Sequence, residues 1–185
     1  MTLKETISVI SLFLLLMVSD CAVGSQYEKA TREASSLLSE YIYSTHGDVK
    51  KTILSKLSYL SYNNPDNINV VRSYTGILSS VGEYKKAISV LESFNKRIKN
   101  TSLLLHECML KDRVGDYEES CYRKVISLKK FNGVNDVDYL IALFMVGDNE
   151  FNKEKGIYMK GRDDNDDLNV FKNKKEDILK EFYPN

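Results

Sequence analysis

Two cysteines, Cys108 and Cys121, have the spacing that most clearly predicts chemistry in this chain. They lie seven residues before and six residues after Gly115. If Gly115 lies in a turn between two helices, residues nearly equidistant from it face each other across the hairpin. In an exported protein, two thiols held close together oxidise. We therefore predict a Cys108–Cys121 disulfide, and the alternative is two buried, reduced thiols that pack as small hydrophobic side chains.

The residues that could bind a metal ion form weaker patterns. The chain has two histidines, His46 and His106, and neither forms a ligand pattern with a Cys, Asp or His, so no zinc site is predicted. His46 precedes a glycine and fits the last turn of a helix, where it would interact with the helix dipole. The acidic stretch 163–167 lacks the Gly and Glu that an EF-hand loop needs, so we interpret it as a solvated loop.

Composition and motifs also narrow the function. The 185 residues include 26 basic and 26 acidic side chains, which gives a formal net charge of zero. That balance argues against a nucleic-acid partner, because such a partner needs a basic stripe. There is no serine elbow, phosphate-binding loop or paired His–carboxylate motif, so we expect neither an enzyme nor a bound cofactor. An enzyme with an unrecognised site would reveal itself by a polar pocket with a perturbed carboxylate pKa.

The first 24 residues fit a secretory signal peptide. Residues 7–18 are predominantly apolar and too few to span a bilayer comfortably, and Ala22 and Gly24 place small residues before a cleavage point at Ser25. We therefore expect a periplasmic or secreted protein. Cys21 offers an alternative, because it resembles the lipid-attachment cysteine of bacterial lipoproteins, although Asp20 departs from the small residue preferred there. An uncleaved signal anchor is a third possibility, and no other membrane contact is expected.

The elements that would position the two cysteines are helices joined by recurring tight turns. Four glycine–acid pairs follow one another at separations of 35, 33 and 32 residues: Gly47-Asp48, Gly82-Glu83, Gly115-Asp116 and Gly147-Asp148. Glycine can adopt the left-handed conformation that ends a helix, and Asp116 can cap the next helix by accepting a backbone N–H. Apolar residues between the turns step by three and four, which indicates stacked helical hairpins.

We therefore predict an all-α fold, a right-handed α-solenoid of about four helical hairpins with a C-terminal capping helix, in one domain over residues 25–185. The hairpins are expected at about 27–62, 67–99, 101–130 and 135–160, and the capping helix at 168–183. One hairpin cannot bury its apolar stripe alone, so its neighbours must stack on it. The alternative is a helical bundle in which the glycine–acid turns recur by chance.

Two of these turns resemble the tetratricopeptide repeat, whose loop and second helix follow the pattern Gly-Asp/Glu-Tyr-x-x-Ala. Residues 82–87 (GEYKKA) match it closely, and residues 115–120 (GDYEES) match it with Ser120 in place of Ala. The first and fourth copies keep only the turn, and the small-residue position of the first helix is mostly lost. The resemblance covers about residues 27–160. It implies that Ala87 and Ser120 lie where paired helices approach most closely, and that Tyr117 faces inward.

The resemblance also implies a function, because tetratricopeptide arrays are protein-binding scaffolds. Their concave face is lined by the first helix of each repeat, so the expected partner is another protein. Carried over by position, the candidate lining residues are Tyr41, Arg72, His106, Met109, Asp138 and Ile141. Tyr, Arg and Met are favoured at interfaces. For Tyr41, Met109 and Ile141 the alternative is ordinary packing.

A small exported helical protein of this kind looks like an immunity protein that neutralises a toxin in the periplasm. We favour this hypothesis because such proteins are small and divergent and lack catalytic groups, which is an analogy of architecture. The alternative is an envelope-assembly or secretion accessory lipoprotein, which palmitate labelling dependent on Cys21 would favour.

Overall fold

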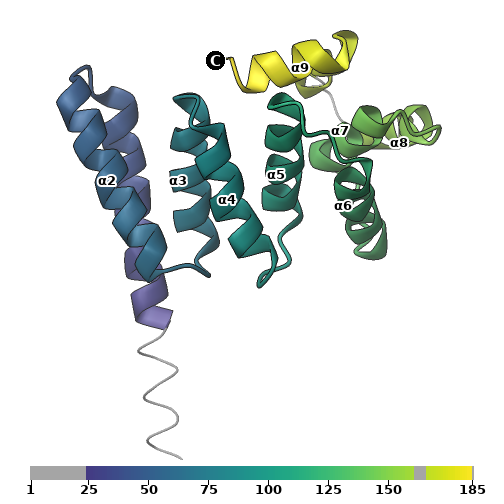
Figure 1. Ribbon diagram of the computed structural model, residues 1–185. Helices are drawn as coiled ribbons and strands as arrows, with labels where there is room; N and C mark the ends of the chain where they lie inside the picture. The colour runs from purple at the N-terminus through teal and green to yellow at the C-terminus, as the bar shows by residue number, and fades with distance from the viewer. Residues whose placement is uncertain (1–23, 161–165, 185) are drawn as a thin grey trace, which may run out of the picture. The chain divides into compact units, whose positions relative to one another are not determined.

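The computed structural model describes residues 24–160 and 166–184, and every regular element in these ranges is a helix. The described chain is therefore all-α, as predicted. Its elements are a helix over residues 24–43, α2 (Gly47–Asn63), α3 (Ile68–Ser80), α4 (Tyr84–Asn95), α5 (Thr101–Arg113), α6 (Glu119–Phe131), α7 (Val137–Val146), α8 (Phe151–Met159), the 3-10 helix η1 (Asp166–Lys172) and α9 (Lys175–Phe182) (Figure 1).

The predicted signal segment falls almost wholly outside these ranges, and Cys21 lies outside them. Among the described helices, none combines the length and the apolar character that crossing a membrane requires.

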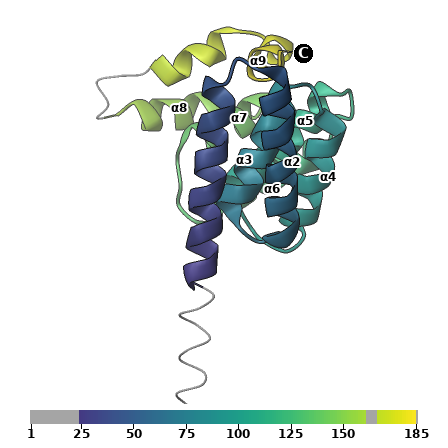
Figure 2. The same cartoon turned by 90° about the vertical axis from the view of Figure 1, so that its left-hand side faces the viewer.

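The described residues up to Ser73 form the first of two compact units. Figure 2 shows its helix 24–43 and α2 lying side by side and antiparallel, joined at one end by residues 44–46. Asn67 fixes the other end, because its Nδ2 donates to the Tyr27 carbonyl at 2.9 Å and its Oδ1 accepts the Val70 N–H at 3.2 Å. The apolar side chains buried in this hairpin are Ala30, Ala34, Leu37, Ile53, Leu57 and Leu60.

The second unit, Tyr74–Asn185, contains the end of α3 and all later elements. Successive helices pack in chain order from α4 to α8. Most side chains of the apolar helix α7 are buried, as its composition predicts. The expected continuous helix over 168–183 is wrong, because the chain breaks at Asn173 and Lys174 between η1 and α9. Of these two pieces, η1 packs on α7 and α9 packs on α5.

Four glycines end helices in the left-handed conformation: Gly82, Gly115, Gly133 and Gly147. At each of them the glycine N–H donates to the carbonyl three residues earlier, and the next N–H donates to the carbonyl five residues earlier. This is the Schellman pattern, which satisfies carbonyls at the end of a helix. The conformation expected at three of the four predicted turns is thus present. Gly47 is different, because it is the first residue of α2.

The residues around the starts of α2 and α6 therefore have other positions than predicted. His46 is the residue preceding α2 and not the end of a helix. Helix α6 begins at Glu119 after Glu118, so Asp116 does not cap it and Tyr117 lies in the loop, exposed. The reason is local: the Asp116 N–H donates to the Lys111 carbonyl at 2.8 Å, which keeps this residue in the turn that ends α5.

The shifted start also changes which small residue lies in the core. Ala87 is fully buried, as the resemblance implies. Ser120 is exposed, so the equivalent expectation for this residue is wrong. The buried positions near the start of α6 belong to Cys121 and Tyr122.

Candidate partner-binding surface

A disulfide between Cys108 and Cys121 joins α5 to α6 across the turn at Gly115. Its S–S distance is 1.98 Å and the two Cα atoms are 5.6 Å apart. The predicted pairing is confirmed. The bond fixes α5, which carries the candidate lining residues His106 and Met109, against α6.

The two candidate lining residues of the first unit differ in exposure. Tyr41 is half-buried, and the Lys50 ammonium lies 5.0 Å from the centroid of its ring. Arg72 is exposed near the start of α3. Both are placed where a partner could contact them, and whether one does so stays a prediction.

Three of the four candidates in the second unit are engaged inside the protein. Met109 and Ile141 are buried, which is the packing alternative. Asp138 is half-buried, and its Oδ2 accepts hydrogen bonds from Ser102 Oγ and Lys129 Nζ. Asp138 thus connects α7 to α5 and α6, while the side chains of Met109 and Ile141 lie in the core.

Lys129 is a buried cation that sequence reasoning missed. Its Nζ lies 2.5 Å from Asp136 Oδ2 and 3.4 Å from Asp138 Oδ2. Asp136 also caps α7, because its Oδ1 accepts the Tyr139 N–H at 3.0 Å. A buried ammonium requires such paired carboxylates, and the network thereby fixes the register of α6 against α7. A lysine in the last turn of a helix gives no sequence signal for burial.

His106, the fourth candidate, lies against Tyr183, the residue that follows α9. The two rings stack with centroids 5.7 Å apart and planes 5° apart. Tyr84 meets the Tyr183 ring edge-on at 6.2 Å, and Arg113 Nε donates to the Tyr183 carbonyl at 2.9 Å. Ser79 Oγ lies 3.0 Å from His106 Nε2. We call these five residues the C-terminal cluster.

Burial sets the charge of this cluster. It lowers the pKa of His106 to about 4, so the imidazole is neutral near neutral pH. Burial also raises the pKa of Tyr183, with smaller contributions from Tyr84 and Asp138. The cluster holds the Tyr183 ring against the rings of His106 and Tyr84, and the Arg113 guanidinium donates a hydrogen bond to the Tyr183 carbonyl. That is an arrangement for holding a peptide segment, and here the segment is the protein's own.

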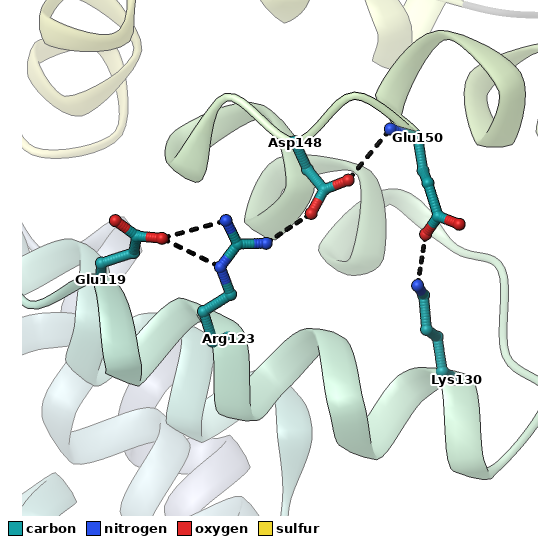
Figure 3. A network of polar contacts seen from close by, with 5 residues as sticks. All are labelled: Glu119, Arg123, Lys130, Asp148 and Glu150. Carbon is teal, nitrogen blue, oxygen red and sulfur yellow. Dashed lines mark hydrogen bonds and ion pairs between the residues drawn. The ribbon is translucent and has the colours of Figure 1, made fainter.

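An exposed network connects α6 to the turn that follows α7 (Figure 3). Arg123 contacts Glu119 on its own helix and Asp148 in the turn, while Lys130 pairs with Glu150. The Glu150 N–H donates to Asp148 Oδ1 at 2.9 Å, and this bond is the main reason that the pKa of Asp148 is lowered. Solvent-exposed ion pairs of this kind orient a turn more than they stabilise it.

A cavity of about 380 Å³ in the second unit has an acidic rim. Two rim carboxylates already have partners, because Asp167 accepts from Tyr158 and Glu181 accepts from Asn173. Its lining consists of Val137, Asp166, Asp167, Asn169, Val170, Asn173, Glu181 and Phe182. Across residues 24–160 and 166–184, no three His, Cys, Asp or Glu side chains are grouped so that they could hold a metal ion.

In comparisons with known proteins, no family model, curated protein or solved structure matches this chain. The resemblance to the tetratricopeptide repeat therefore stays a prediction that rests on residues 82–87 and 115–120.

Proposed function

We propose that this protein is an exported protein-binding scaffold of the immunity type, which neutralises a toxin partner in the periplasm. In this proposal the helices form a right-handed solenoid of about four hairpins with a C-terminal cap. The left-handed glycines at 82, 115 and 147 support the hairpin repeat. The Cys108–Cys121 disulfide supports export, because such bonds persist in oxidising compartments.

The observation that carries the binding role is the exposure of tyrosines on the hairpin of the first unit. Tyr43, Tyr59 and Tyr62 are 85%, 72% and 83% exposed, and Ile42 beside Tyr43 is also exposed. Tyr59 and Tyr62 lie three residues apart on one side of α2, so one partner can contact both. Tyrosine combines a large apolar ring with a hydrogen-bonding tip, which makes it a frequent energetic centre of interfaces. We define Tyr59 and Tyr62 as the α2 tyrosine pair.

This assignment moves the proposed contact from α5 to α2. The α5 face around His106 is covered by Tyr183, whereas the α2 tyrosine pair projects into solvent. Neutralising a toxin requires a rigid surface that covers its target. Within the first unit, Asn67 holds the hairpin that carries the pair, because it donates to the Tyr27 carbonyl and accepts the Val70 N–H.

The test is to isolate the tagged full-length protein from the envelope of its own cells and to identify the bound protein by mass spectrometry. We expect a partner whose toxicity disappears when the purified protein is added at a ratio of about one to one. A stable complex with a non-toxic envelope-assembly component would overturn the immunity proposal. Palmitate labelling that is lost in Cys21→Ala would then favour the accessory lipoprotein.

The contact surface has its own test with the identified partner. Tyr59→Ala combined with Tyr62→Ala should weaken binding by about tenfold or more, because truncated interface tyrosines often cost more than 1 kcal/mol each. Phe131→Ala is the matched control, since Phe131 is an equally exposed aromatic residue at the end of α6. Equal affinities for the double variant and the control would exclude the α2 tyrosine pair.

A further inference from the structure

Tyr183, which follows α9, occupies a specific site on the α4–α5 hairpin. Tyr183 is only 8% exposed, although Phe182 beside it is 48% exposed. In Figure 1, α9 lies across the end of α5 at which Arg113 is found. The segment formed by α9 and Tyr183 reaches the α4–α5 hairpin through the Tyr183 ring and carbonyl, which contact Tyr84, His106 and Arg113.

The rest of the segment packs on α5 and is held by further contacts. Helix α9 has eight residues, of which Ile178 and Leu179 are buried. Lys175 at its start donates to the Met145 carbonyl at 2.8 Å. A helix this short is not stable alone in water, so its order depends on these contacts and on the seat of Tyr183.

We propose that the segment from Lys175 to Tyr183 is an acid-released latch, which is seated on the α4–α5 hairpin while His106 is neutral and leaves it when His106 gains a proton.

Among the described residues, no carboxylate forms an ion pair with the His106 ring. From α3 it meets the Ser79 hydroxyl, and from the C-terminal segment the Tyr183 ring. Tyr84 of α4 and Arg113 of α5 contact Tyr183, and Arg113 is itself a cation. The carboxylate of Asp138 in α7 acts on Tyr183. Burial is what lowers the pKa of His106 to about 4, and the seated segment is part of that burial.

The size of the effect follows from the two protonation states. An exposed histidine has a pKa of about 6.5, so releasing the segment lets His106 bind a proton more readily. Because proton binding by His106 and release of the segment are thermodynamically linked, protonation of His106 must favour release by the same factor. With a pKa of about 4 when seated and at most about 6.5 when released, the population of the released segment rises by up to roughly 20-fold between about pH 7 and pH 5. This inference does not depend on the identity of any partner.

The first test follows the two histidine resonances of the full chain by NMR during a pH titration. His46, exposed in the first unit, supplies an internal reference in every spectrum. We expect His106 to titrate at least one pH unit higher in Tyr183→Ala than in the wild type. Tyr183→Phe, which keeps the ring, should preserve the low midpoint. If His106 titrates at the same pH in the wild type and Tyr183→Ala, the latch is excluded.

The second test measures amide hydrogen exchange in α9 near pH 7 and pH 5, corrected for intrinsic exchange rates. Opening of α9 should rise by up to roughly 20-fold in the wild type and stay nearly constant in His106→Phe. That variant keeps a ring against Tyr183, and Ser79 retains its bond to the Thr75 carbonyl at 2.7 Å. Circular dichroism confirms that each variant is folded at both pH values. An equal rise in His106→Phe, or no rise in the wild type, overturns the proposal.

Discussion

The disulfide between Cys108 and Cys121 links two helices whose Cα atoms lie 5.6 Å apart at these positions, on opposite sides of the Gly115 turn. Because a closed loop of this size restricts the unfolded chain, its reduction should lower the free energy of unfolding by about 3 kcal/mol. Urea denaturation with and without reductant measures the difference. The variant with both cysteines changed to Ala should not respond to reductant. If mass spectrometry counts both as free thiols in the untreated protein, the pairing is wrong.

Ala87 and Ser120 occupy equivalent positions in the repeat pattern, but only Ala87 is buried. Ala87→Leu should therefore cost about 1–3 kcal/mol, because added methyl groups overpack a filled core. Ser120→Leu should change stability by less than about 0.5 kcal/mol, as surface substitutions usually do. Thermal and urea unfolding of the two variants provide the comparison. Similar losses in both would restore the equivalence that the pattern implies.

Lys129 and Lys130 are neighbours in sequence with opposite environments. Lys129→Ala leaves Asp136 and Asp138 without their buried cation, and should cost about 3 kcal/mol. Lys130→Ala breaks an exposed pair with Glu150 and should cost less than about 1 kcal/mol. The measurement is the urea midpoint of each variant at an unchanged m-value. Equal effects would mean that Lys129 is not a structural charge.

Local signals made much of this fold predictable. The periodic apolar residues mark the helices, and glycines such as Gly82 and Gly115 mark their ends because few other residues adopt a positive φ at low cost. The disulfide was predictable because Cys108 and Cys121 are nearly equidistant from one turn. The start of α6 was not predictable, because the Asp116 N–H donates to the Lys111 carbonyl and this residue therefore does not cap α6.

The candidate site was less predictable, because contacts distant in sequence determine it. Repeat register predicts the face of α5 to which His106 belongs, but not that the chain's own Tyr183 covers that face. Arg113 and Tyr183 are 70 residues apart, and no periodicity links them. Met109 and Ile141 are buried for a related reason, since the pattern identifies apolar positions without saying which of them a neighbouring helix covers.

Because folding keeps His106 neutral, the free energy of unfolding of the whole protein should depend on pH. Burial lowers its pKa to about 4 in the folded state, whereas the unfolded chain has the ordinary value of about 6.5. The unfolded state therefore binds the proton first as pH falls. The contribution of His106 is complete above about pH 6.5 and is lost progressively toward about pH 4, by up to about 3 kcal/mol.

Urea unfolding of the wild type and His106→Phe near pH 7 and pH 4.5 isolates this contribution. The wild type should lose about 2–3 kcal/mol more than the variant over this interval. Acidic groups such as Asp148, whose pKa is also lowered, are present in both proteins and cancel in the difference. Parallel losses in the two proteins would show that the folded state accepts the His106 proton with little penalty.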